Sequence, residues 1–497
     1  MSENSDSDGA ELDNFLEPPT LVKNKEVHIY IDERGEVHRF EVGQPSKETK
    51  RRYQNVISAL DSGEFRSLLD EATSLSEQDE EPDIDDGHAA LLSDVAKGIH
   101  GDGRGIAGVC CAQLFTKSIE PGLTVRLHKG GKSTEDFSWR EGWSLRQVDN
   151  RADVGTGVEL NRRGILYSNT DGGAVMTRTL AESEPFTNVY EPAVAGPRQA
   201  WLEVVDSIER EELDPERGII YLLKRLVDEK RLTEEFTEQI LELVAQFATT
   251  EPSMGEVRDL ISAHVRQADR GAPLLEIAVH SFLQVIEDAG SLTGELVQLQ
   301  TLTSPDRRGG ESTREVRDLG DVQLTTDGSV RVAWDAKLDI TITHEELASL
   351  EEKLGSGMMP NRVGYTTLDE PELGSEVDDQ PEDLEVDGLN LELYSLEGFI
   401  KEYTKATDSR SQTVEPADWL VSYVETLARQ RPDRAVVRES PLSWLEGLQE
   451  LLGDRYDLHV DEAKKEVDLE SGTESDSTED RYTSTAQQSG LDDFSGS

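Results

Sequence analysis

The chain has 497 residues, enough for two or three domains with buried cores, and its 103 acidic and 50 basic residues give a formal net charge of −53. The acidic residues run through the whole chain and are interleaved with amphipathic helical patterns, which excludes a disordered acidic tail as their main cause. This balance predicts a halophilic archaeal protein that works in molar salt, where charges are screened beyond about 3 Å. Net acidity is then no argument against nucleic-acid binding, and only local clusters of basic residues indicate where nucleic acid could bind.

Two further features argue against a secreted or membrane protein. The first residues contain no apolar segment like that of a signal peptide, and no window approaches about 18 uninterrupted apolar residues. Cys110 and Cys111 are adjacent and have no partner at metal-binding spacing, which predicts two buried thiols in a reducing cytoplasm. We expect a cytoplasmic protein with no membrane partner.

The N-terminal part is predicted to begin with a disordered segment, 1–20, followed by an α+β domain, 21–200. Apolar residues alternate over 26–42 around the turn Asp32-Glu33-Arg34-Gly35, which predicts a β-hairpin. An acidic loop is expected at 75–87.

Two local basic clusters lie in this domain, which makes it a candidate for DNA recognition. In the second, a predicted loop at 126–133, Lys129 and Lys132 are candidate DNA contacts; it ends like a phosphate-binding loop, but Arg126 occupies the position of the first glycine. For the first cluster we favour a solvated helix face over contact with DNA phosphates. Its members have helical spacing: Lys47, Lys50, Arg51 and Arg52.

A helical region is predicted at 201–270. Two amphipathic segments, 219–227 and 240–247, flank Leu232-Thr233-Glu234-Glu235. Thr233 is a preferred N-cap residue, so we expect two helices with the second capped at this point.

The most informative stretch is 315–340. Gly320-Asp321 opens a short β run, Thr326-Asp327-Gly328 is a hairpin turn signal, and a second alternating run ends in Asp335-Ala336-Lys337. Strand alternation has a period of two, so Asp335 and Lys337 are predicted to share one face, with a second carboxylate at the start of the paired strand.

The preceding helix, 273–288, carries Glu276 in an apolar stripe. A metal-dependent phosphodiesterase needs carboxylates that hold Mg²⁺, which polarises the phosphate and lowers the pKa of a bound water. Asp321, Asp335 and Glu276 are therefore candidate Mg²⁺ ligands. Lys337 completes the candidate catalytic set, because its ammonium group can position the water or stabilise developing charge.

Downstream of the hairpin the pattern predicts a helix at 343–354 and strands at 361–368 and 389–396. Short helices are expected within 411–468, and the segment 469–497 has the composition of a disordered acidic tail. We expect an α/β fold with a mixed central β-sheet flanked by helices, a largely helical insert and an N-terminal α+β region.

The order of these elements resembles the core of PD-(D/E)XK nucleases. Gly320-Asp321 stands in the place of Pro-Asp, Asp335-Ala336-Lys337 matches the (D/E)-x-K element, and Glu276 matches the acidic residue of the preceding helix. The resemblance covers 271–410 and implies a restriction-endonuclease-like core.

A second resemblance extends over about 100–405. The segments 169–186 and 196–202 are similar to the region ahead of the nuclease core in SacI-type restriction endonucleases. That similarity implies sequence-specific cleavage of double-stranded DNA by a homodimer, beside a partner methyltransferase encoded nearby. Arg178 is then a candidate DNA contact, although an i,i+4 pair with Glu182 is the favoured interpretation.

The C-terminal segment 488–495 resembles a peptide that binds a sliding clamp. Gln488, Leu491 and Phe494 have the expected spacing, and Ser495 stands where a second aromatic residue is usual. Such a peptide folds as a short helical plug whose apolar side chains fill a pocket.

The sequence thus predicts a Mg²⁺-dependent, site-specific DNA endonuclease of restriction type. A repair or replication nuclease recruited by the sliding clamp, and a non-catalytic nucleic-acid-binding or scaffold protein, remain as alternatives.

Overall fold

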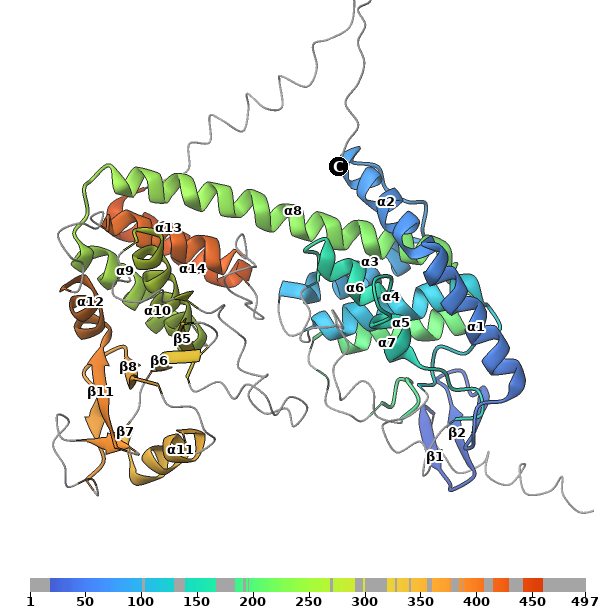
Figure 1. Cartoon of the computed structure of the whole chain (residues 1–497). Helices are drawn as coiled ribbons and strands as arrows, with labels where there is room; N and C mark the ends of the chain where they lie inside the picture. Colours follow the sequence, from blue (N-terminus) through green and yellow to red (C-terminus); the bar gives the residue numbers. More distant parts are fainter. Residues whose placement is uncertain are drawn as a thin grey trace, which may run out of the picture. The chain divides into compact units, whose positions relative to one another are not determined.

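The chain is a mixed α/β protein, as the sequence predicts (Figure 1). The computed structural model describes a set of ranges: 18–100, 103–128, 139–166, 184–190, 194, 196–268, 271–290, 298–299, 320–326, 329–338, 341–354, 360–375, 377, 384–386, 388–405, 414–428 and 441–458. The chain divides into two compact units, and the first of them ends at Leu458. Within these ranges, no helix is both long and apolar enough to cross a membrane.

The predicted N-terminal hairpin is confirmed. Strands β2 (Val27–Ile31) and β3 (Val37–Glu41) pair antiparallel, and Gly35 takes a φ of 80° in the turn between them. A third strand, β1 (Thr20–Lys23), adds to β2. It was not predicted, because four residues are too few to show alternation.

Helices follow this sheet. The expected acidic loop from residue 75 is wrong at its start, because α2 continues to Glu77 and buries Ser76. The long helices are α1 (Lys47–Ser62), α2 (Glu64–Glu77), α3 (Asp86–Lys97), α4 (Arg104–Ile119) and α7 (Arg198–Glu209). The short ones are α5 (Leu145–Asp149) and α6 (Thr156–Arg162).

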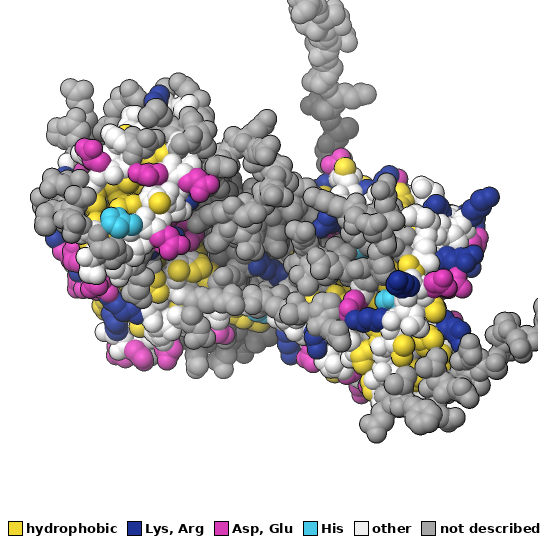
Figure 2. Space-filling view, turned by 90° about the horizontal axis from the view of Figure 1, so that it is seen from below, with side chains coloured by type: hydrophobic (Ala, Val, Ile, Leu, Met, Phe, Trp, Pro, Cys, Tyr) yellow, Lys and Arg dark blue, Asp and Glu magenta, His cyan; other side chains and the backbone are white. Residues whose placement is uncertain are grey.

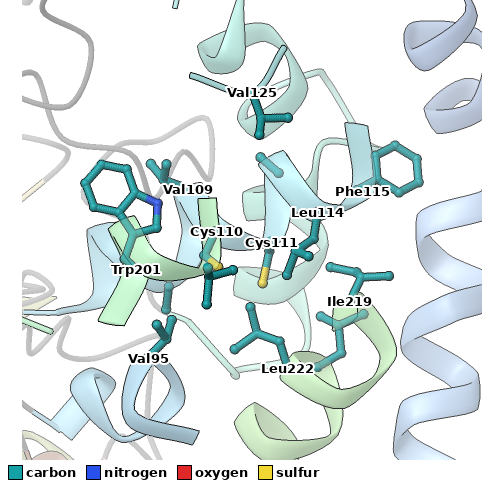
Figure 3. Close-up of a cluster of buried hydrophobic side chains, with 14 of the residues drawn as sticks. Val95, Val109, Cys110, Cys111, Leu114, Phe115, Val125, Trp201, Ile219 and Leu222 are labelled. Carbon is teal, nitrogen blue, oxygen red and sulfur yellow. The ribbon is translucent and has the colours of Figure 1, made fainter. Parts of the chain in front are cut away.

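Helix α4 forms the centre of the N-terminal core (Figure 3). Cys110 and Cys111 are free, buried thiols on this helix, as predicted. Burial raises the pKa of both thiols, which keeps them protonated and unreactive. Their neighbours in the cluster include Val95, Leu114, Trp201 and Leu222.

Helix α8 (Pro215–Ala248) is a single helix of 34 residues, so the predicted break at Thr233 is wrong (Figure 1). The Thr233 hydroxyl donates to the carbonyl of Glu229 at 2.9 Å, the bond of a mid-helix threonine and not of an N-cap. Neither glycine nor proline occurs from Ile219 to Ala248, and Lys230 pairs with Glu234 across one turn at 2.9 Å. The polar stretch that suggested a helix start is a solvated part of one continuous helix.

The C-terminal helices are α9 (Met254–Gln267), α10 (Gly271–Asp288), α13 (Pro416–Leu427) and α14 (Pro441–Tyr456). Helices α13 and α14 confirm the short helices expected there. Trp419 of α13 donates its indole N–H to the carbonyl of Ala278 in α10 at 3.0 Å, which ties the two helices together.

A six-stranded mixed sheet follows α10, with the strand order β10-β11-β8-β6-β5-β4. Strands β5 and β6 pair antiparallel, with Thr326 opposite Ser329, as the predicted hairpin requires. Strands β6, β8 and β11 are parallel. The bounds are β4 (Gln298–Leu299), β5 (Val322–Thr326), β6 (Ser329–Lys337), β8 (Arg362–Thr367), β10 (Glu385–Val386) and β11 (Leu389–Ser395).

Two helices accompany these strands. Helix α11 (His344–Leu354) joins β6 to the parallel strand β8, as predicted, and α12 (Leu396–Lys405) follows β11. Thr343 caps the start of α11, because its hydroxyl accepts from the backbone N–H of Glu346 at 3.4 Å. Strand β7 (Thr341–Ile342), just before α11, pairs in parallel with β9 (Glu372–Leu373), which follows β8, and the two form a separate small sheet.

The two faces of the sheet have different partners. Trp334 of β6 packs against Phe399 of α12, which in turn contacts Phe282 of α10. On the other face, Ala333 joins an apolar cluster that contains Leu350 and Leu354 of α11. Helices α10 and α12 therefore belong to the Trp334 face, and α11 belongs to the face of Ala333.

The continuity of α8 gives a test of the fold. In the Glu234→Pro variant, proline would lie in a helix interior, and we expect the free energy of unfolding to fall by about 3 kcal/mol. The Thr233→Ala variant should change it by less than about 0.5 kcal/mol, because no cap is lost. Urea unfolding followed by circular dichroism in molar KCl would measure both. A tolerated proline, together with a loss of about 1 kcal/mol in Thr233→Ala, would instead indicate a capped break.

Candidate active site

The hairpin brings Asp321 and Asp335 together. Val322 at the start of β5 pairs with Trp334 of β6, so Asp321 lies beside Asp335 at the same end of the hairpin. Oδ2 of Asp321 accepts a hydrogen bond from the backbone N–H of Ala336 at 2.8 Å. Both residues are buried: Asp321 is 5% exposed and Asp335 is 8% exposed. Two carboxylates buried to this extent require cationic or hydrogen-bonding partners.

Two lysines reach Asp335. Nζ of Lys337 lies 3.2 Å from Oδ2 of Asp335, which shows that the two side chains share a face of β6. Nζ of Lys353, in the last turn of α11, lies 3.9 Å from the same oxygen. Both lysine side chains are 36% exposed, so each ammonium group is also open to solvent.

The neighbouring strand adds a buried tyrosine to this face. Tyr365 of β8 is paired with Asp335 in the parallel register. Burial raises the pKa of its hydroxyl, and the negative charges of Asp335 and of Glu346 in α11 raise it further. The hydroxyl therefore stays neutral and can act as a hydrogen-bond donor.

Sequence reasoning missed Lys353, Tyr365 and Glu346. Each lies on an element that follows the hairpin. Lys353 and Tyr365 come next to Asp335, and Glu346 acts on Tyr365, only because the crossover from β6 to β8 folds α11 and β8 against the hairpin. Their sequence signal is weak: Glu346 and Lys353 are seven residues apart, so they lie near the same side of α11.

Gly320 explains why glycine precedes Asp321. A Cβ atom at position 320 would lie 2.6 Å from the carbonyl oxygen of Trp334, and 2.8 Å from its carbonyl carbon. The close approach of the β6 backbone leaves no space for a side chain. The glycine thus allows Asp321 to reach the N–H of Ala336.

Glu276 has a different position. It is buried, with 8% exposed, on α10, the helix of the Trp334 face. Asp335 and Lys337 point to the other face. The structure therefore brings together Asp321, Asp335 and Lys337, and places Glu276 on a helix that approaches the same strand from the opposite side.

The other candidate residues lie outside the described ranges. These are the possible DNA contacts Lys129, Lys132 and Arg178, and the possible clamp-binding residues Gln488, Leu491 and Phe494.

The basic cluster of α1 is partly neutralised within the helix. Glu48 accepts hydrogen bonds from both Arg51 and Arg52, at 2.8 Å each. On the face of the molecule seen in Figure 2, Lys and Arg side chains are interspersed with Asp and Glu side chains. These pairings favour the solvated helix face over a dedicated phosphate-binding surface.

A second acidic group is structural. Asp32, Glu36 and His38 bring ligand atoms within 4.8 Å of one another. However, Arg210 donates to Oδ2 of Asp32 at 2.8 Å, and the backbone N–H of Glu36 donates to Oδ1 at 2.8 Å. Burial alone would raise the pKa of Asp32, but the hydrogen bonds outweigh it and lower the pKa to about 2. A guanidinium on this carboxylate takes the place that a metal ion would need.

The hairpin site is the better candidate for a metal ion. Asp321 and Asp335 supply adjacent carboxylates, and oxygen ligands are those that Mg²⁺ prefers. Both cations on Asp335 are flexible lysines and not a fixed guanidinium fork, so they can move aside. The donor set therefore fits Mg²⁺.

Comparison with known proteins adds no family to this description. No protein-family model matches the sequence, and a search of curated proteins gives no match.

Gly320 provides a test of the site. In the Gly320→Ala variant the methyl group would overlap the backbone of β6, so we expect Asp321 to be displaced and the free energy of unfolding to fall by about 1–3 kcal/mol. Gly290, with a φ of 66° and open space around it, is the matched control, since an alanine there is strained but meets no neighbour. Urea unfolding and Mn²⁺ titration would measure the two effects. Unchanged Mn²⁺ binding in Gly320→Ala would contradict a metal site that includes Asp321.

Proposed function

We propose that the protein is a Mg²⁺-dependent endonuclease of restriction type that hydrolyses phosphodiester bonds in double-stranded DNA. The observation that carries the proposal is the convergence of Asp321, Asp335 and Lys337 at one end of the β5–β6 hairpin. Two carboxylates and a lysine on neighbouring strands form the minimal donor set for metal-assisted phosphoryl chemistry.

Each residue has a role in this proposal. Asp321 and Asp335 would hold the Mg²⁺ ion, which when bound polarises the scissile phosphate and acidifies a water molecule. Lys337 would orient the attacking water or stabilise the charge that develops on the phosphate. The position of Lys337 on the face of Asp335 supports this role, since its ammonium group is within 4 Å of the proposed metal ligand.

The topology supports a nuclease core of the PD-(D/E)XK kind. Helix α10 precedes the hairpin, α11 crosses over, and β8 returns parallel to β6, which gives a mixed sheet with helices on both faces. Glu276 lies on α10, which approaches β6 from the opposite face, so this proposal does not count it among the groups that hold the metal ion. We further propose a halophilic, cytoplasmic protein that acts as a homodimer beside a DNA methyltransferase.

Removal of the proposed ligands tests the catalytic assignment. We expect Asp335→Asn and Lys337→Met each to lower the rate of plasmid cleavage by about 100-fold or more, because each removes a charge that acts in the transition state. Cleavage would be measured on supercoiled plasmid with Mg²⁺ in molar KCl. Asp259→Asn is the matched control, since Asp259 is an exposed carboxylate on α9 that pairs with Arg258.

Glu276→Gln separates the contribution of α10. We expect a smaller loss of cleavage rate than in Asp335→Asn, because Glu276 approaches from the other face of the sheet.

The substrate that is cleaved decides between the classes of nuclease. Discrete plasmid fragments support a restriction enzyme, whereas cleavage confined to flaps or ends supports a repair nuclease recruited by a sliding clamp. Absence of cleavage by the unaltered protein would leave a non-catalytic nucleic-acid-binding or scaffold protein, and unchanged cleavage in Asp335→Asn would contradict the catalytic assignment.

A further inference from the structure

Lys353 lies in the candidate site but has no place in the function proposed so far. Its ammonium group is 3.9 Å from Oδ2 of Asp335, the oxygen that also contacts Lys337. The contact joins α11 to β6 across 18 residues of sequence and depends on the packing of α11 against the Ala333 face. One carboxylate thus has two ammonium groups at the same oxygen.

The contact contributes little to the stability of the fold. A distance of 3.9 Å is that of a loose ion pair and not of a hydrogen bond, and the lysine side chain is 36% exposed. Helix α11 is already anchored by Leu350 and Leu354, which are buried in the apolar cluster. The position of the ammonium group therefore calls for a role other than holding the helix.

The charges suggest what that role is. Two ammonium groups contact one oxygen of Asp335, and Asp321 lies beside that carboxylate at the same end of the hairpin. A divalent cation held by these carboxylates would replace the ammonium groups at that oxygen and bring the oxygens of a bound phosphate within their reach. Lysine is suited to this exchange because its long side chain carries a compact charge that is not fixed in a fork.

We propose that Lys353 is a second phosphate-binding lysine of the site, which shares Asp335 with Lys337 in the free protein and contacts the substrate phosphate in the complex. The inference rests on the proposed nuclease function. It implies that one side of the site is built by the crossover helix α11, which is packed on the sheet through Leu350 and Leu354.

Two opposite effects of the Lys353→Gln variant test this inference. In the full chain without DNA, we expect the dissociation constant for Mn²⁺ to fall about fivefold, because a positive charge that competes for Asp335 is removed. With saturating DNA, we expect the single-turnover cleavage rate to fall about 10- to 100-fold, because a cation that stabilises the phosphate is lost. Calorimetry and plasmid cleavage in molar KCl would measure these effects. A merely structural lysine would not strengthen metal binding while slowing cleavage.

Two further variants serve as references. Lys353→Arg keeps the charge and should retain the cleavage rate within about tenfold. Lys401→Gln removes an exposed lysine of α12, on the opposite face, that pairs with Glu397, and should match the unaltered protein in both measurements.

The outcomes separate the inference from the function on which it rests. Cleavage by Lys353→Gln at the rate of Lys401→Gln would overturn the role of Lys353 while leaving the nuclease intact. Absence of cleavage by the unaltered protein, together with tighter Mn²⁺ binding in Lys353→Gln, would overturn the nuclease and support Lys353 as part of a cation site. Weaker Mn²⁺ binding with a lower melting temperature would overturn the inference in favour of a structural role.

Discussion

The packing of Trp334 determines how the candidate site is presented. Its ring lies 5.2 Å from that of Phe399, and its indole N–H donates to the hydroxyl of Tyr403 at 2.8 Å. Gly364 on the next strand makes this possible, because a Cβ atom there would lie 2.2 Å from the Trp334 ring. Side chains alternate along a strand, so a fixed Trp334 directs Asp335 and Lys337 to the other face. A register shift of one residue would bury Asp335 among aromatic rings, at a cost of several kcal/mol.

The N-terminal part of the chain contains buried ion pairs in addition to its aromatic packing. Arg126, which is 2% exposed, pairs with Asp206 and donates to the carbonyl of Phe186 at 3.1 Å. Arg210 links the same Asp206 to Asp32 of the hairpin turn. In molar salt, exposed charges are screened within about 3 Å, whereas buried pairs are screened much less. If the chain works under such conditions, as its charge predicts, these contacts retain their strength and the surface pairs of α1 and α8 do not.

The sequence was sufficient for those features that local patterns encode. Alternation and turn residues predicted the two hairpins, and the helix at 343–354 and the strand at 361–368 followed from periodicity and capping. The break at Thr233 was wrong because a threonine can bond to the carbonyl four residues back as well as cap a helix, and only the packing decides between them. The same limit applies to the site. Asp335 and Lys337 are two residues apart and could be placed on one face, but the contact of Lys353 and the position of Glu276 depend on which helix covers which face.

An acidic chain offers many carboxylates to every lysine, so a contact alone says little about function. The environment of the carboxylate is more informative. Glu48 also receives two cations, but its side chain is 56% exposed, and water would stabilise its charge in their absence. The side chain of Asp335 is 11% exposed, and its charge is costly without a partner. A buried carboxylate that contacts two partly exposed lysines can exchange either lysine for a metal ion, and a cation still lies beside its negative charge. That property is what a site for metal-assisted phosphate chemistry requires, and a surface ion pair does not need it.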